Sequence, residues 1–129
     1  MINPTNKPTI LVIEDEESLL EAVAISLEEV GFQVVKSRIA DQAWQYLQDI
    51  GPVDLIWLDH YLLGEDGINF TKRLRADEKL KNLPIFVVSN SEDRDKEKEY
   101  QDLGIIKYYT KSENSLEKII SEVTAFLGK

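Results

Sequence analysis

Four short apolar segments of this chain are each followed by polar residues that could take part in phosphate chemistry. In chain order these residues are the pair Glu14-Asp15, then Asp59, Ser89 and Lys111. If the four segments are neighbouring parallel strands, their carboxyl ends meet at one edge of a sheet. Carboxylates, a hydroxyl and an amine would then share one small site, a combination that indicates a divalent cation and a phosphoryl group.

The charges of such a site would not be stable alone. Two carboxylates about 4 Å apart repel each other by roughly 4 kcal/mol at an effective dielectric constant near 20, so a proton or a cation must offset the charge. Magnesium fits best, because it keeps several waters and prefers few protein ligands. Ser89 could donate a hydrogen bond to one phosphoryl oxygen, and Lys111 could neutralise another. These groups would stabilise transfer of a phosphoryl group onto a carboxylate.

The spacing of apolar residues predicts five strand–helix units that would position this site. The expected strands are residues 10–14, 32–37, 53–59, 85–89 and 107–110, and the expected helices are 17–30, 41–50, 68–75, 91–103 and one from about residue 114. This alternation predicts a parallel sheet covered on both faces. The expected fold is a three-layer α/β domain with strand order 2-1-3-4-5, in which the first and third strands are neighbours.

Several local signals concern the ends of these helices. Asp41 is predicted to cap the second helix, and Asp66 is interpreted as a cap of the third helix rather than a metal ligand. The last helix is expected to start near Asn114, with Glu117 placed to complete a capping box. The segment 91–103 is charged almost throughout, so we expect a helix that is only weakly held against the sheet.

The composition limits the classes of protein to which the chain can belong. Its 129 residues suit a single domain, 1–129, with a polar tail over residues 1–8. The net charge of −9 opposes binding to nucleic acid phosphates. The absence of cysteine and the single histidine, His60, argue against thiolate metal sites and a zinc centre. No segment has the character of a signal peptide or a membrane helix, so we expect a soluble cytoplasmic protein without membrane contact.

Taken together, the motifs resemble the receiver domain of bacterial two-component response regulators. They are the segment 10–16, Leu58-Asp59 with Asp66-Gly67, Val88-Ser89 and Thr110-Lys111. They keep the order and spacing of that family and span about the whole chain. The resemblance implies a flavodoxin-like fold. It also implies a phosphoacceptor switch whose only chemistry is its own phosphorylation and dephosphorylation, rather than an enzyme.

The resemblance further implies a role for each residue of the site. Asp59 would accept a phosphoryl group from a histidine kinase or phosphotransfer protein, in a reaction that needs Mg²⁺ and involves Ser89 and Lys111. The implied metal ligands are Glu14, Asp15, Asp59 and the backbone carbonyl of Tyr61. Ser89 and Tyr108 would form a switch, although a half-buried strand aromatic is an equally good interpretation of Tyr108. The switch would reshape the face of the fourth helix, fifth strand and fifth helix, which would bind a protein target or a second copy of the chain.

Three positions depart from the family pattern. Ser112 stands where the family usually has a proline after a cis peptide bond, and we expect a cis Lys111–Ser112 bond because the lysine depends on that loop. Leu62-Leu63 replaces a common Met-Pro pair, and Asn90 replaces a frequent alanine. Because Asn90 and Tyr61 are bulky, we expect water to attack the acyl phosphate slowly, which predicts a long-lived phosphoryl state.

Two alternative classes of function compete with this hypothesis. A receiver-like interaction module that is not phosphorylated is compatible with the loss of two prolines, but the retention of all five chemical positions argues against it. An enzyme or cofactor carrier on the same fold is the other alternative. A flavin-binding relative needs a loop rich in Ser, Thr and Gly after the first strand, where residues 14–17 are all acidic. A phosphatase of the haloacid type needs Asp-x-Asp there, which this chain lacks.

Overall fold

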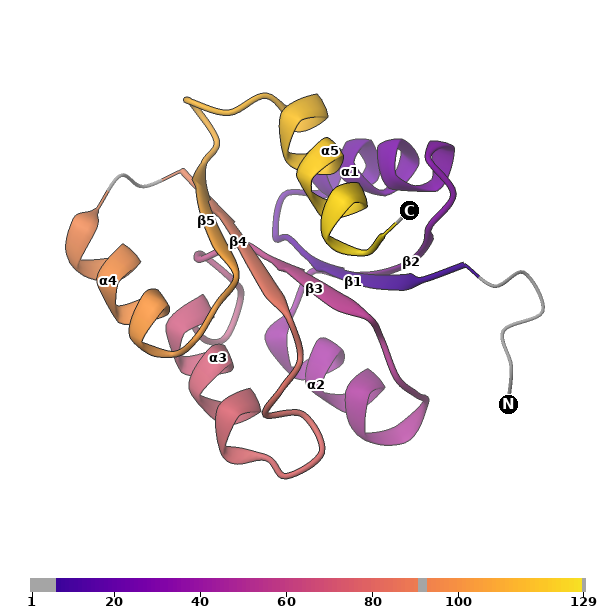
Figure 1. Cartoon of the computed structure of the whole chain (residues 1–129). Helices are drawn as coiled ribbons and strands as arrows, with labels where there is room; N and C mark the ends of the chain where they lie inside the picture. The colour runs from indigo at the N-terminus through magenta and orange to yellow at the C-terminus, as the bar shows by residue number, and fades with distance from the viewer. Residues whose placement is uncertain (1–6, 91–92, 129) are drawn as a thin grey trace.

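Five strands alternate with five helices in the computed structural model, which describes residues 7–90 and 93–128 (Figure 1). The strands are β1 (Thr9–Ile13), β2 (Gln33–Ser37), β3 (Leu55–Leu58), β4 (Ile85–Ser89) and β5 (Lys107–Thr110). The helices are α1 (Glu17–Glu29), α2 (Ala40–Asp49), α3 (Gly67–Ala76), α4 (Arg94–Asp102) and α5 (Leu116–Phe126). Most of the predicted polar tail, residues 1–6, lies outside the described chain. All five predicted strand–helix units are confirmed.

The strands form one parallel sheet in the order β2-β1-β3-β4-β5. The predicted flavodoxin-like topology is therefore confirmed, with β1 and β3 as hydrogen-bonded neighbours at the centre. Every residue of β3 and β4 is buried, as expected for strands covered on both faces. The edge strands β2 and β5 are partly exposed. Because all strands run in the same direction, their carboxyl ends share one rim.

Two apolar clusters hold the three layers together, one on each face of the sheet. On one face, Ile10 and Val12 of β1 pack with the buried side chains of α1 and α5. On the other face, Leu11 and Ile13 pack with those of α2, α3 and α4. Figure 1 shows the same division, with the indigo α1 and yellow α5 on one side and the other three helices opposite. This alternation follows from the two-residue repeat of a strand.

Two of the predicted helix caps are wrong. Helix α2 starts after Ile39, and Asp41 lies inside its first turn instead of capping it. The start of α2 is set by its surroundings, because Ser37 Oγ donates to the Ile39 carbonyl oxygen at 2.8 Å and Ile39 forms a β-bridge with Leu63. The cap of α5 is Ser115, and therefore Glu117 is one position too early to complete a capping box.

The predicted cap of α3 is confirmed, because the Asp66 carboxylate accepts a hydrogen bond of 2.8 Å from the Asn69 backbone N–H. Asp93, the first residue described after the gap at 91–92, caps α4. The predicted start of this helix at residues 91–92 lies outside the described chain. Tyr100 is the buried residue of α4, in agreement with a weakly held helix.

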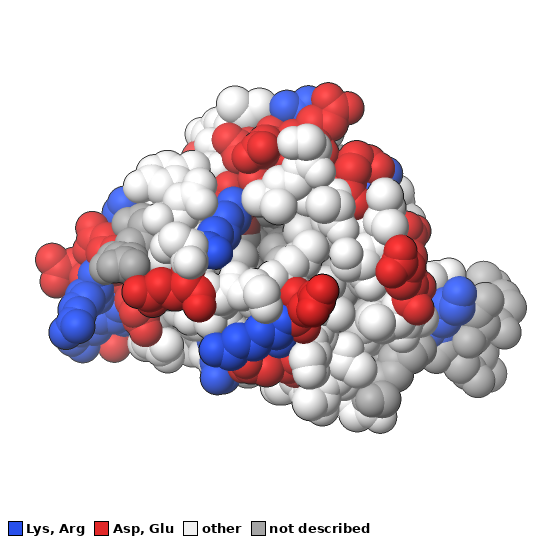
Figure 2. Space-filling model, turned by 90° about the horizontal axis from the view of Figure 1, so that it is seen from above, with Lys and Arg blue, Asp and Glu red and all other residues white. Residues whose placement is uncertain are grey.

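The surface carries mixed charge. Seen from above in Figure 2, acidic side chains are spread over the face, and Lys and Arg side chains lie among them in small groups. This pattern agrees with the net charge of −9. Over residues 7–90 and 93–128, none of the helices combines the length and apolarity that crossing a lipid bilayer requires.

Candidate functional site

The carboxyl ends of β1 and β3 bring three carboxylates into one pocket. Ile13 lies opposite Leu58 in the sheet, so the residues that follow these two positions stand at the same level. One carboxylate oxygen each from Glu14, Asp15 and Asp59 lies within 4.8 Å of the other two. Glu14 and Asp59 are buried, and Asp15 is partly exposed. The predicted gathering of these carboxylates at one edge of the sheet is therefore confirmed.

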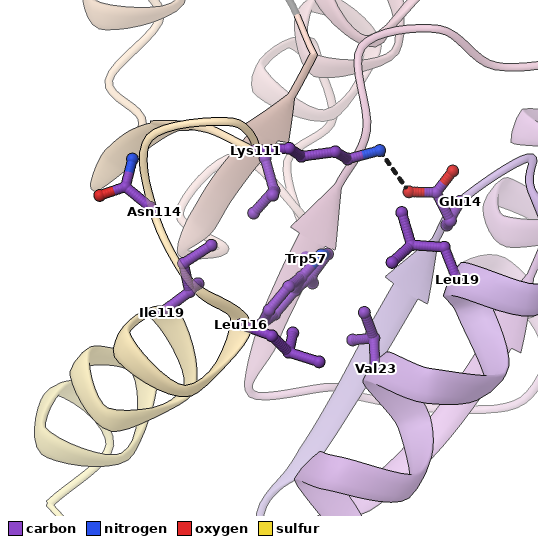
Figure 3. A pocket seen from close by; sticks show the side chains of 9 residues that line it. Glu14, Leu19, Val23, Trp57, Lys111, Asn114, Leu116 and Ile119 are labelled. Carbon is purple, nitrogen blue, oxygen red and sulfur yellow. Dashed lines mark hydrogen bonds and ion pairs between the residues drawn. The ribbon is translucent and has the colours of Figure 1, made fainter.

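Lys111 reaches this acidic cluster from the loop after β5. Its Nζ atom lies 2.8 Å from Glu14 Oε1 (Figure 3). The same atom lies 3.5 Å from Asp59 Oδ1. Its backbone N–H donates to the carbonyl oxygen of Ser89 at 2.7 Å. The lysine is thus held both at its backbone and at its ammonium group, and one positive charge serves two buried carboxylates.

The peptide bond after this lysine is trans, and the expected cis Lys111–Ser112 bond is wrong. A turn accounts for the loop, because the backbone N–H groups of Glu113 and Asn114 donate to the carbonyl oxygen of Thr110 at 3.1 and 3.2 Å. The side-chain amide of Asn114 donates to the same oxygen at 3.1 Å. A non-proline cis bond would cost roughly 2.5–4 kcal/mol. Since the lysine reaches its partners without it, nothing offsets that cost.

Ser89 and Tyr108 lie close together beside the cluster. Ser89 is fully buried at the end of β4, where it pairs with Thr110 of β5. The Tyr108 ring is half-buried, and its centroid lies 5.8 Å from that of Tyr100. Burial raises the pKa of Tyr108, and a hydrogen bond with Ser89 opposes that rise. The two residues predicted to act as a switch are therefore in contact.

A family model described as the response regulator receiver domain matches residues 10–124 of the chain. The chain belongs to the response regulator receiver family. Receiver domains are phosphoacceptor switches and not conventional enzymes, as the sequence implied. The match includes the acidic cluster, Ser89 and Lys111, and the chain is thus a receiver of two-component signalling with an acidic pocket.

Curated and solved relatives agree with this assignment. The receiver is 33% identical over 103 residues to the phosphate regulon transcriptional regulatory protein PhoB of Pseudomonas aeruginosa, covering 80% of this chain and 44% of that protein. The chain therefore spans less than half the length of this curated relative. The structure of the phosphorylated cyanobacterial phytochrome response regulator RcpA is 27% identical, with a TM-score of 0.80 and coverage of 93% and 91% of the two chains. The Mn²⁺-bound response regulator Rcp1, at 24% identity and a TM-score of 0.80, shares the fold over 93% of this chain and 94% of its own.

The electrostatics of the receiver pocket favour a cation. Asp59 is only 3% exposed, and its Oδ1 atom is enclosed without a hydrogen-bond partner among the described residues. Burial and then the charge of Glu14 raise the pKa of Asp59 from 3.8 to about 7, while Lys111 acts in the opposite direction. Three carboxylates with one ammonium group leave an excess of negative charge. Hard oxygen donors, one of them without a hydrogen bond, fit a divalent cation such as Mg²⁺.

Sequence reasoning missed Arg38, which fixes the backbone beside this pocket. Its Nε and one terminal guanidinium nitrogen donate to the carbonyl oxygen of Asp15 at 3.0 and 2.9 Å. Arg38 follows β2, whose end lies at the same rim because β2 pairs with β1. Arg38 directly follows an expected strand, as Lys111 does. This position was the signal that could have identified it.

The two residues after Asp59 contact α4. His60 is buried, and its Nδ1 atom shares a hydrogen bond of 2.7 Å with the Tyr100 hydroxyl. Burial lowers the pKa of His60, with Lys96 as a further cause. Tyr61 is half-exposed, with its ring edge-on to His60 and its hydroxyl accepting from Lys96 Nζ at 3.0 Å. His60 therefore turns away from the acidic pocket and toward Tyr100 of α4.

Proposed function

We propose that this receiver accepts a phosphoryl group on Asp59 from a histidine kinase or phosphotransfer protein in the cytoplasm. The observation that carries the proposal is the enclosed Oδ1 atom of Asp59, which has no hydrogen-bond partner among the described residues and lies 3.5 Å from the lysine in a cluster of three carboxylates. A buried carboxylate oxygen that lacks a hydrogen bond is costly, so it is retained where its reactivity is used.

In the proposed reaction, a carboxylate oxygen of Asp59 attacks the phosphorus atom of a phosphohistidine. The new P–O bond forms as the P–N bond breaks, and the departing imidazole nitrogen takes up a proton from solvent. Lys111 lies 3.5 Å from the acceptor carboxylate and neutralises negative charge on the transferred group. Ser89, at the neighbouring strand end, donates to one of the phosphoryl oxygens.

Glu14, Asp15, Asp59 and the backbone carbonyl of Tyr61 would hold Mg²⁺, with Glu14 already paired to Lys111. The ion would supply charge neutralisation for the carboxylates and the incoming phosphoryl oxygens. Arg38 fixes the backbone of Asp15, so that its carboxylate is presented to the pocket.

The proposed output is a change in the face of α4, β5 and α5. Phosphorylation adds about −1.5 to −2 charges and new acceptor oxygens at Asp59. The Ser89 hydroxyl would leave Tyr108 to bond one of these oxygens, and the Tyr108 ring would then repack against α4 and Tyr100. A downstream protein, or a second copy of the chain, would recognise this altered face.

Intact-mass measurement after incubation with acetyl phosphate and Mg²⁺ tests the proposal. We expect the mass to increase by one phosphoryl group in the wild type and not in Asp59→Asn. Asp66→Asn is the matched control, because asparagine is as good a helix cap as aspartate and the variant keeps the acceptor. A wild-type protein without the added mass, or an Asp59→Asn protein with it, would contradict the proposal.

A further inference from the structure

A cavity of about 220 Å³ lies between α1, α5 and the sheet, next to the acidic pocket (Figure 3). Its walls are largely apolar and come from both helices and two central strands: Leu19, Val23, Trp57, Val88, Leu116 and Ile119. Glu14, Lys111 and Asn114 close the polar end. An engineered apolar cavity of about 150 Å³ is large enough to bind benzene, so this one could hold a ring with several further atoms.

The indole N–H of Trp57 is an unused donor in this cavity. Trp57 is only 2% exposed, yet its nitrogen has no hydrogen-bond partner within residues 7–90 and 93–128. The nitrogen is not fully enclosed by protein atoms, because Asp59 Oδ1 is the single enclosed side-chain atom of the described chain that lacks a hydrogen bond. Figure 3 shows it on the side of the ring toward Lys111 and Glu14. Buried indole N–H groups usually have a partner, so this donor points to an acceptor that the protein itself does not supply.

The other polar groups of the cavity are already engaged. The amide nitrogen of Asn114 donates to Thr110, and its oxygen accepts from Lys118 at 2.9 Å. The Lys111 ammonium group is shared between Glu14 and Asp59. The nearby charge is therefore negative in sum, which disfavours an anionic ligand. The free donor and this charge together favour a neutral molecule with a hydrogen-bond acceptor.

We propose that this cavity is a binding site for a small neutral molecule with a ring-sized apolar body and a carbonyl oxygen. The body would contact the side chains of α1 and α5, and the carbonyl oxygen would accept a hydrogen bond from Trp57 Nε1. This site is separate from phosphoryl transfer on Asp59, although Lys111 and Glu14 border both. Binding at this place would put a ligand directly beside the lysine of the receiver pocket.

The indole N–H signals in ¹H–¹⁵N NMR spectra provide the test, with acetophenone as the probe and with no Mg²⁺ or phosphodonor present. Trp44 is an internal control, because it lies in the opposite helical layer against Arg73 and Phe70. We expect acetophenone to shift the Trp57 signal saturably and to leave the Trp44 signal in place. Ethylbenzene, which has the ring without the carbonyl, should bind roughly three- to tenfold more weakly. Benzoate should not bind.

The variant Trp57→Phe keeps an aromatic ring and removes the N–H. In this variant, followed by the methyl signals of Val23 and Leu116, acetophenone and ethylbenzene should bind equally. Absence of a saturable Trp57 shift, equal affinities of the two probes for the wild type, or tighter binding of benzoate would each overturn the proposal. If Trp57→Phe does not fold, the comparison of probes on the wild type still decides. The outcome is independent of the phosphorylation experiment, because no phosphoryl group is transferred.

Discussion

Asp59 is a carboxyl group whose surroundings oppose its ionisation. Burial, followed by the charge of Glu14, raises the pKa of this carboxyl group to about 7. Lys111 offsets part of this effect but is shared with Glu14. A proton and a cation therefore stabilise the same pocket by the same means, since each neutralises negative charge.

This balance predicts how stability depends on pH without metal. Between about pH 4 and 7 the folded protein keeps the Asp59 proton, whereas the unfolded chain has lost it. Unfolding then releases a proton, so this residue lowers the free energy of unfolding as pH rises through that window. Asp59→Asn cannot ionise. We expect the variant to exceed the wild type in stability by roughly 2 to 3 kcal/mol at about pH 8, and by much less at about pH 4.

Urea denaturation at both pH values in the presence of EDTA measures this difference. Glu29→Gln is the control, because it removes one negative charge from an exposed position at the far end of α1. A stabilisation by Asp59→Asn that is the same at both pH values would show that the raised pKa is not its source.

At this scale the sequence predicted the residues that follow strands and missed those that depend on packing. Asp59 and Lys111 could be placed because a parallel sheet brings strand ends together. The trans bond at Ser112 depends on a turn around Thr110, which no local pattern indicated. The unpaired Trp57 N–H depends on the gap left between two helices, and helix spacing cannot be obtained from one sequence.

At the scale of elements, one buried side chain of α4 contacts the loop that follows Asp59. Tyr100 is fully buried, and its hydroxyl meets both His60 and the start of α3. Gly67 begins α3 at this point, and the Gly67 N–H donates to the His60 carbonyl oxygen at 2.8 Å. The receiver pocket and α4 are thereby in direct contact through the residue after Asp59.

The close approach at Gly67 predicts a coupled pair of mutations. A Cβ atom there would collide with the Tyr100 hydroxyl and would lie 3.0 Å from the Asp59 carbonyl oxygen. Gly67→Ala should therefore lower the free energy of unfolding by about 1 to 3 kcal/mol, despite the better helix propensity of alanine. In a Tyr100→Phe background the loss should be smaller, because the hydroxyl is gone, with a coupling energy of about 1 kcal/mol.

A double-mutant cycle in urea measures this coupling. Gly51→Ala is the matched control, since a Cβ atom at Gly51 meets nothing within 4 Å and the change should stay within about 0.5 kcal/mol. Additive losses for Gly67→Ala and Tyr100→Phe would contradict the contact. Hydrogen exchange in α4 should also become faster in Tyr100→Phe, because the buried hydrogen bond to His60 is lost.

The elements themselves could largely be predicted, and their ends could not. Short apolar runs and helical spacing identified all five strand–helix units. The start of α2 differs from the prediction because the Ile39–Leu63 bridge joins two loops that are distant in sequence. An acidic residue such as Asp41 is a local signal for the start of a helix. Here a contact between distant loops determines the first residue of α2 instead.

At the scale of the whole molecule, the acidic pocket joins parts of the chain that folding must bring together. Glu14 and Asp15 follow β1, Asp59 follows β3 and Lys111 follows β5, so the pocket exists only when the sheet from β1 to β5 is assembled. An unfolded chain separates these charges and relieves their repulsion. A ligand that binds the assembled carboxylates therefore stabilises the entire fold by mass action, because it has little affinity for the unfolded state.

Mg²⁺ is accordingly expected to raise the unfolding temperature of the receiver. Above its dissociation constant, each tenfold increase in Mg²⁺ concentration should add about 1.4 kcal/mol to the free energy of unfolding. Calorimetry in MgCl₂ and in NaCl of equal ionic strength separates binding from general screening of the net charge of −9. Asp15→Asn should abolish the increase in unfolding temperature that is specific to Mg²⁺, because it removes the most exposed of the three carboxylates. Glu29→Gln, at an exposed position of α1, should retain that increase. An equal increase in NaCl, or an undiminished one in Asp15→Asn, would mean that the acidic cluster does not bind the ion.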